Sequence, residues 1–377
     1  MDKIIPYQRQ FIDEDDIKAV SEALRSDFLT TGPKVKEFEE KFANHVNSKY
    51  AVAFSSGTAA LHLACLTAGL KQGDELITSA ITFLASANCA LYCNAKPVFV
   101  DIDLQGLMDI EDVKEKINEK TKVIIPIHYG GMPVNIKELR ENFSGIIVED
   151  SCHALGALYN KDKVGNCKYS DMTIFSFHPV KHITTGEGGM ITTNNKEIYE
   201  KLKVLRNHGI DHDKKPEQEP WATPMYELGF NYRLTDFQCA LGISQLNKLD
   251  NFIKSARKIA EKYNQELKNN LNIKIIKEKP EQFNSYHLYS ILVKNKEIRL
   301  KLYNYLRKNN ILVQVHYQPI YLQPYYKNLG YKEGTCPKAE DFYNRLLSLP
   351  IYPQLSEQDQ NFVINKIKGF FEKRENE

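Results

Sequence analysis

Residues 50–66 have the sequence Tyr50-Ala-Val-Ala-Phe-Ser-Ser-Gly-Thr-Ala-Ala-Leu-His-Leu-Ala-Cys-Leu66. Tyr50 to Phe54 form an apolar run of the length of a buried strand, and the residues from Ala59 onward favour a helix. The same rhythm continues to residue 150, with strands expected at 75–78, 97–101, 123–127 and 146–150, and helices at 86–92, 109–118 and 136–141. Such alternation predicts an α/β fold with a mainly parallel sheet covered by helices on both faces.

The chain on either side of this unit is expected to be helical first and mixed later. Two helices are expected before it, at 13–26 and directly after Gly32-Pro33. After it, we expect one long helix or two consecutive helices at 236–267, strands at 285–293 and 311–317, and helices at 298–308, 337–347 and from Ser356. We therefore predict a large domain at 1–245 and a smaller α+β domain at 246–377.

Composition excludes several classes of protein. The 377 residues include 50 basic and 48 acidic side chains, so no nucleic-acid footprint is expected. No apolar run approaches the roughly 20 residues of a membrane-spanning helix, and the first residues lack the pattern of a signal peptide. The seven scattered cysteines include no Cys-x-x-Cys pair, which favours reduced thiols and a cytoplasmic protein.

Two His-x-x-x-His spacings could place a pair of metal ligands on one face of a helix. They are formed by His178 with His182 and by His208 with His212. Pro179 and the glycine at 209 interrupt a helix at these places, so the paired histidines would not share a helix face. We expect no metal site.

One lysine stands between two strand-like segments, in Phe175-Ser-Phe-His-Pro-Val-Lys181 followed by Gly186-Glu-Gly-Gly189. Pro179 prevents a helix before it, and the glycines allow the backbone to pass close to a neighbour. A desolvated lysine has a lowered pKa and presents a neutral amine that can attack a carbonyl, here the aldehyde of pyridoxal phosphate. On Lys181 alone, an ordinary surface lysine in a turn remains the alternative.

Further candidate residues follow other strands, because ligands in open α/β sheets bind beyond the carboxyl ends of the strands. Ser55-Ser-Gly-Thr58 ends a strand and opens a helix, which suits a phosphate but is also common in helix caps. Asp150 could pair with the pyridinium nitrogen of the cofactor, or cap the segment after it.

Three more side chains could contact the same ligand. His153 could reach the ring or its phenolic oxygen, and a satisfied interior histidine is the alternative. Ser176, at the end of a strand, could donate to the phosphate. Phe83 could stack on the ring, although a core phenylalanine is the commoner case.

Four motifs in this order resemble those of the DegT/DnrJ/EryC1/StrS sugar aminotransferases. They are Asp150-Ser-Cys-His-Ala-Leu-Gly156, Phe175 to Lys181 with Gly186 to Gly189, Leu205-Arg-Asn-His-Gly209, and Glu227-Leu-Gly-Phe-Asn-Tyr-Arg-Leu-Thr-Asp236. The resemblance extends from Thr30 to Tyr317. It implies a pyridoxal-phosphate-dependent enzyme of aminotransferase fold type I, and a homodimer with active sites at the subunit interface.

The resemblance also implies roles for single residues. Lys181 would be the catalytic Schiff-base lysine, Asp150 would pair with the pyridine nitrogen, and His153 would lie against the cofactor. The other implied cofactor contacts are Gly57, Thr58 and Ser176 at the phosphate, Phe83 at the ring, and Asn231 at the phosphate of the partner subunit. The candidate substrate contacts are Tyr7, Arg233, His316 and Tyr317, each of which could equally be an interface or core residue.

Within the family, Gln314-Val-His-Tyr317 and His287-Leu-Tyr289 are most similar to members that act in pseudaminic acid biosynthesis. This implies transfer of an amino group from L-glutamate to C4 of a UDP-linked 4-keto-6-deoxy-N-acetylhexosamine, with pyridoxamine phosphate as the other form of the cofactor. The alternatives are another nucleotide-linked keto sugar, of the bacillosamine, legionaminic acid or perosamine type, and a non-catalytic cofactor-binding protein. A dehydratase of the same fold would carry histidine in place of Lys181.

Overall fold

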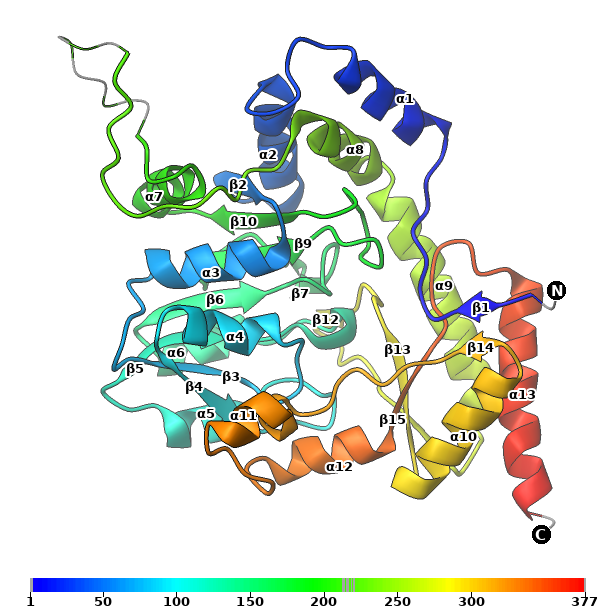
Figure 1. Cartoon of the computed structure of the whole chain (residues 1–377). Coiled ribbons are helices and arrows are strands. Elements are labelled where there is room, and N and C mark those ends of the chain that lie inside the picture. The colour runs from blue at the N-terminus through cyan, green and yellow to red at the C-terminus, as the bar shows by residue number, and fades with distance from the viewer. Residues whose placement is uncertain (1–2, 212–213, 215–216, 218, 220, 376–377) are drawn as a thin grey trace.

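The computed structural model describes residues 3–211, 214, 217, 219 and 221–375 (Figure 1). Its centre is a seven-stranded sheet with the strand order β2-β10-β9-β6-β5-β3-β4. The strands are β2 (Tyr50–Phe54), β3 (Glu75–Ser79), β4 (Lys96–Val100), β5 (Thr121–Ile125), β6 (Ile146–Asp150), β9 (Met172–Ser176) and β10 (Gly189–Thr193). Neighbouring strands pair in parallel except at β10, which is antiparallel to both β2 and β9. The predicted α/β class with a mainly parallel sheet is confirmed.

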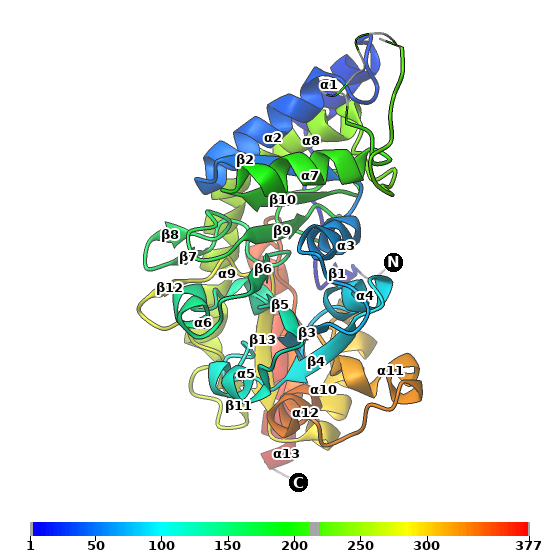
Figure 2. The same ribbon diagram turned by 90° about the vertical axis from the view of Figure 1, so that its left-hand side faces the viewer.

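Helices cover both faces of this sheet. They are α2 (Pro33–Val46), α3 (Gly57–Thr67), α4 (Ala85–Tyr92), α5 (Ile110–Lys116), α6 (Ile136–Asn142), α7 (Lys196–Arg206) and α8 (Asp236–Leu246). Figure 2 shows α3 and α4 on one side of the strands, and α5 and α6 on the other. Side chains alternate along a strand, so Val52 of β2 packs in the cluster with α3 while Ala53 packs in the cluster with α2. Burial on both faces explains why the strands are almost wholly apolar.

The N-terminal segment contacts both the helices at the edge of the large sheet and the C-terminal region. Helix α1 (Glu14–Leu24) begins at the expected cap, Asp13, and lies against α8. The buried carboxylate of Asp16 accepts hydrogen bonds from Gln245 at 2.8 Å and Lys248 at 2.9 Å. Strand β1 (Ile5–Pro6) pairs in parallel with β14 (Ile311–Leu312), so the start of the chain lies in the C-terminal region (Figure 1).

The C-terminal region has a smaller antiparallel sheet of β11 (Ile273–Ile275), β13 (Tyr289–Val293) and β15 (Leu346–Leu349). Its helices are α9 (Leu249–Leu267), α10 (Lys296–Lys308), α11 (Pro324–Asn328), α12 (Pro337–Arg345) and α13 (Glu357–Glu375). Short elements complete the chain: η1 (Tyr129–Gly131), η2 (Ile320–Leu322), β7 (Leu158–Tyr159), β8 (Asp162–Lys163) and β12 (Gln282–Phe283). We propose that the domains divide after residue 245, close to the junction of α8 and α9. Within the described ranges, no helix combines the length and apolar character that a membrane crossing needs.

Two expected strands are shorter than predicted. Only Tyr289–Val293 is regular in the first, because the backbone of Ser285 and Leu288 bonds to the turn at Gly130 and Gly131 instead. In the second, only Ile311–Leu312 is regular. Gln314 then forms an isolated bridge with Ser348 of β15, and Ile320 donates its N–H to the carbonyl of Ala80, directly after β3. The expected helix at 337–347 also ends earlier, at Arg345, since Leu346 begins β15. Apolar runs alone did not distinguish these loops from strands.

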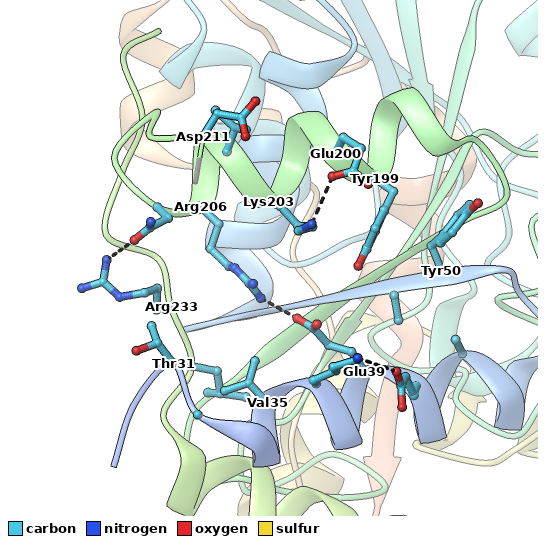
Figure 3. A pocket seen from close by; sticks show the side chains of 18 of the residues that line it. Thr31, Val35, Glu39, Tyr50, Tyr199, Glu200, Lys203, Arg206, Asp211 and Arg233 are labelled. Carbon is cyan, nitrogen blue, oxygen red and sulfur yellow. Dashed lines mark hydrogen bonds and ion pairs between the residues drawn. The ribbon is translucent and has the colours of Figure 1, made fainter. Parts of the chain in front are cut away.

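An ion pair binds the free backbone groups of the edge strand β2. Ala53 donates its N–H to Glu39 at 2.8 Å and accepts a hydrogen bond from Arg206 at 2.8 Å. Arg206 and Glu39 are themselves 2.5 Å apart, and Glu39 is only 9% exposed (Figure 3). The two side chains therefore satisfy backbone groups that would otherwise offer an open sheet edge.

We expect Arg206→Met to lower the free energy of unfolding by about 3–5 kcal/mol, because removing one partner leaves a buried, uncompensated carboxylate. Chemical denaturation measures this change. The matched control is Lys368→Met, whose ion pair with Glu266 lies at the surface and which should change stability by less than about 0.5 kcal/mol. Equal stability of the two variants would contradict the role assigned to the pair.

Candidate active site

Lys181 lies in the turn between β9 and β10, as the sequence predicted. Its N–H donates to the carbonyl of His178 at 2.8 Å, and Phe177 and Gly188 close the base of the turn with a hydrogen bond of 2.9 Å. Burial lowers the pKa of the Lys181 ammonium group, which the nearby Asp150 partly opposes. The site therefore favours a neutral amine at Lys181 more than water would.

Asp150 ends β6 and is held by two donors. Its Oδ2 accepts a hydrogen bond from Ser86 Oγ at 2.6 Å, and its Oδ1 accepts one from the Cys152 N–H at 3.1 Å. Ser86 is bonded in turn to Thr82 Oγ1 at 2.8 Å. Ionised oxygens accept more than one hydrogen bond each, so the fixed carboxylate can still accept one from a cationic ring nitrogen. Sequence reasoning missed Ser86 and Thr82, although polar side chains at the start of an apolar helix were a usable signal.

The turn from β2 into α3 lies directly beside the end of β9. A Cβ atom built on Gly57 would lie 3.0 Å from Ser176 Cβ and 3.5 Å from Cys152 Sγ. Ser56 caps α3 by accepting from the Ala59 N–H. The N–H groups of Gly57 and Thr58 therefore stand at a helix N-terminus with the Ser176 hydroxyl close by, which suits a phosphate.

His153 links this site to the C-terminal region. Its Nδ1 accepts a hydrogen bond from the Gly130 N–H at 3.3 Å, and its Nε2 lies 3.2 Å from Tyr317 Oη. Burial lowers the pKa of His153 well below its usual value. Because Nδ1 accepts from Gly130, the neutral ring carries its proton on Nε2 and donates a hydrogen bond to Tyr317 Oη. The ring of Phe83 lies 6.1 Å from that of Tyr317 and is 55% exposed, so Phe83 is not a core residue.

The structure brings together three of the four candidate substrate residues. The rings of Tyr7 and His316 are 5.2 Å apart, and His316 is next to Tyr317. Burial lowers the pKa of His316 to about 4. These residues reach the site because β1 and β14 pair at its border.

Arg233 and Asn231 lie elsewhere. Arg233 lines a cavity of about 920 Å³ between α2 and α7, where it donates to Asn207 Oδ1 at 2.6 Å (Figure 3). Asn231 is exposed and pairs with Asn207 through its backbone. In the described part of the chain, no hydrogen bond or ion pair joins either residue to Lys181.

The residues gathered around Lys181 fit pyridoxal phosphate. Each part of the cofactor has a counterpart: an amine for the aldehyde, a fixed carboxylate for the ring nitrogen, a helix N-terminus for the phosphate and an exposed aromatic ring for the ring face. Gly57 supports the fit, because a side chain there would fill the space beside Ser176. Of the metal candidates, His212 lies outside the described residues, and the described residues contain no group of three or more His, Cys, Asp or Glu placed to hold an ion.

Comparison with known proteins shows what the whole chain is similar to. The chain is 38% identical to the UDP-4-amino-4,6-dideoxy-N-acetyl-β-L-altrosamine transaminase of Campylobacter jejuni over 98% of both chains. Helicobacter pylori PseC, an aminotransferase involved in the biosynthesis of pseudoaminic acid, superposes with a TM-score of 0.92 at 34% identity, over 98% of this chain and 100% of PseC. The PLP form of Streptococcus pneumoniae Spr1654 gives a TM-score of 0.92 at 31% identity, over 98% of this chain and 99% of that one.

These similarities confirm the expected aminotransferase architecture and the use of pyridoxal phosphate. The model of one family matches residues 10–368, nearly the whole chain. The chain therefore belongs to the DegT/DnrJ/EryC1/StrS aminotransferase family.

Proposed function

We propose that this sugar aminotransferase moves the amino group of L-glutamate to C4 of a UDP-linked 4-keto-6-deoxy-N-acetylhexosamine, as in pseudaminic acid biosynthesis. The observation that carries the proposal is the full-length similarity to the Campylobacter transaminase. The gathering of Tyr7, His316 and Tyr317 beside the Lys181 turn supports it, since a sugar with several hydroxyl groups needs polar side chains around its ring.

The chemistry assigned to each residue follows from its surroundings. When bound, pyridoxal phosphate supplies an aldehyde that condenses with amines and a ring that withdraws electrons from the carbon next to the nitrogen. Lys181 Nζ, whose pKa is lowered by burial, would be the amine that holds the aldehyde group, and when free it would be the base that takes up and returns a proton at the reacting carbon. Asp150, held by Ser86, would stabilise positive charge on the ring nitrogen of the bound cofactor.

We further propose a homodimer in which Asn231 of one protomer reaches the cofactor phosphate of the other. The segment that carries Asn231 supports this proposal, because several of its large apolar side chains are exposed to solvent in the isolated protomer. Trp221, Met225 and Leu228 are all more than half exposed. Apolar side chains gathered in this way are typical of a protein interface. The seven unpaired cysteines favour a cytoplasmic enzyme.

We expect Ser86→Ala to lower kcat/KM at least tenfold while the cofactor stays bound. A hydrogen bond to a charged group contributes about 1.5–3 kcal/mol, and each 1.4 kcal/mol corresponds to about a factor of ten in rate. Steady-state kinetics with glutamate and a keto sugar measure the change. Ser21→Ala, in the peripheral helix α1, is the matched control and should leave kcat/KM unchanged. A Ser86 variant with normal kinetics would show that Asp150 does not depend on this donor.

A panel of keto sugars tests the substrate. With L-glutamate present, we expect the UDP-linked 4-keto precursor of the altrosamine product to give the highest kcat/KM, by about tenfold or more over acceptors of the bacillosamine, legionaminic acid and perosamine type. Mass spectrometry of the aminated nucleotide sugars measures each product. A clear preference for another acceptor would contradict the proposed sugar while leaving the aminotransferase assignment in place.

A further inference from the structure

Two aromatic side chains flank Asn231 on the segment between α7 and α8. The rings of Phe230 and Tyr232 are stacked, with centroids 5.0 Å apart and planes 18° from parallel. In an extended segment, residues two positions apart point to the same side and the residue between them points to the other. The stacked pair thus turns toward the protein, and Asn231 is exposed.

His62 of α3 contacts both rings from inside the protein. Its ring lies 5.0 Å from that of Phe230, edge-on, and its Nδ1 lies 3.3 Å from Tyr232 Oη. On its other side it packs against Tyr92 of α4, at 5.4 Å. His62 is only 8% exposed, and burial lowers its pKa, so it is neutral near pH 7. A neutral, wedged imidazole leaves the stacked pair little freedom to move.

The backbone of the segment is fixed independently of His62. Tyr232 accepts a hydrogen bond from the Ser55 N–H and donates one to the Arg206 carbonyl, at 2.8 and 3.1 Å. The segment also crosses residues 205–210 at close range, since a Cβ atom on Gly209 would lie 1.7 Å from the carbonyl oxygen of Glu227. The backbone bonds set the path of the chain. The contacts of His62 with Phe230 and Tyr232 hold the two rings in place on this backbone, and so keep Asn231, which lies between them, turned outward.

We infer that His62 is a positioning residue for Asn231, fixing through Phe230 and Tyr232 the direction in which the Asn231 amide leaves the protein surface. The inference rests on the proposed function, in which that amide binds the phosphate in the partner's active site. Under this inference, helix α3 contributes to two phosphate sites. The first turn of α3 serves the phosphate site of its own subunit, and His62, further along the same helix, serves the phosphate site of the other subunit.

Mixed dimers test this inference. A chain carrying His62→Ala is co-expressed with a chain carrying Lys181→Ala, each with its own tag, and the mixed species is isolated. In that dimer, the one site with Lys181 lies in the His62→Ala chain but receives Asn231 from a chain with an intact His62. The readout is the dissociation constant of pyridoxal phosphate, followed by the visible absorption of lysine-bound cofactor, which reports only that site.

We expect the His62→Ala homodimer to bind the cofactor about tenfold more weakly, by analogy with the lower end of the loss seen when a side chain that orients a metal ligand is removed. The mixed dimer should bind with the wild-type constant. Tyr232→Phe, which removes one hydroxyl group, should give a smaller loss that is restored in the same way, and it carries the test if His62→Ala does not fold. His45→Ala, a half-buried histidine on α2, is the matched control and should bind normally.

Asn231→Ala in the same mixed dimers distinguishes a failure of the inference about His62 from a failure of the proposed role of Asn231. If Asn231→Ala is restored by the partner and His62→Ala is not, His62 acts within its own chain and the inference is wrong. A His62→Ala homodimer with the wild-type constant also overturns it. If Asn231→Ala is itself not restored, the proposed role of Asn231 across the interface fails, and the inference fails with it.

Discussion

The site depends on a buried carboxylate, Asp150, at the end of a central strand. Burying a charge is costly unless donors surround it. Ser86 and the Cys152 N–H meet that requirement, and Ser86 fixes the start of α4 relative to β6. Because β6 and β9 are parallel neighbours, their carboxyl ends lie together, and the turn after β9 brings Lys181 to the same place. The carboxylate, the amine and the first turn of α3 are thus placed by the sheet itself.

The remainder of the site comes from distant parts of the chain. Gly130 donates to His153 and accepts from the Leu288 N–H, so one turn joins the sheet to the loop before β13. Tyr317 bonds to His153 from the segment after β14, and the pairing of β14 with β1 brings Tyr7 to the same region. The C-terminal region therefore closes the site, and its irregular loops supply polar side chains that a regular strand would turn partly away.

The sequence predicted the parts of the molecule that obey a simple rule. Strands buried on both faces form apolar runs, so the unit from Tyr50 to Asp150 was predicted well, and the rule of carboxyl ends placed Asp150, Ser176 and Lys181 together. The hydrogen bond from Ser86 to Asp150 was not predictable, because it joins residues 64 positions apart and depends on how α4 packs. The predicted lengths of the strands near Ser285 and Val313 were wrong, because these loops carry apolar residues between their polar ones and so resemble strands in sequence. Asn231 came only from family resemblance, although the aromatic residues on both sides of it are a physical signal of its direction.

The most direct test of the central claim is the visible absorption spectrum of the purified protein with pyridoxal phosphate, for the wild type and for Lys181→Ala. The account predicts a band of lysine-bound cofactor in the wild type that is lost on addition of L-glutamate and returns on addition of the UDP-linked 4-keto sugar. The Lys181→Ala protein should show neither the band nor the cycle. A wild-type protein without the band, or a Lys181→Ala protein that completes the cycle, would contradict the assignment of Lys181 and the function built on it.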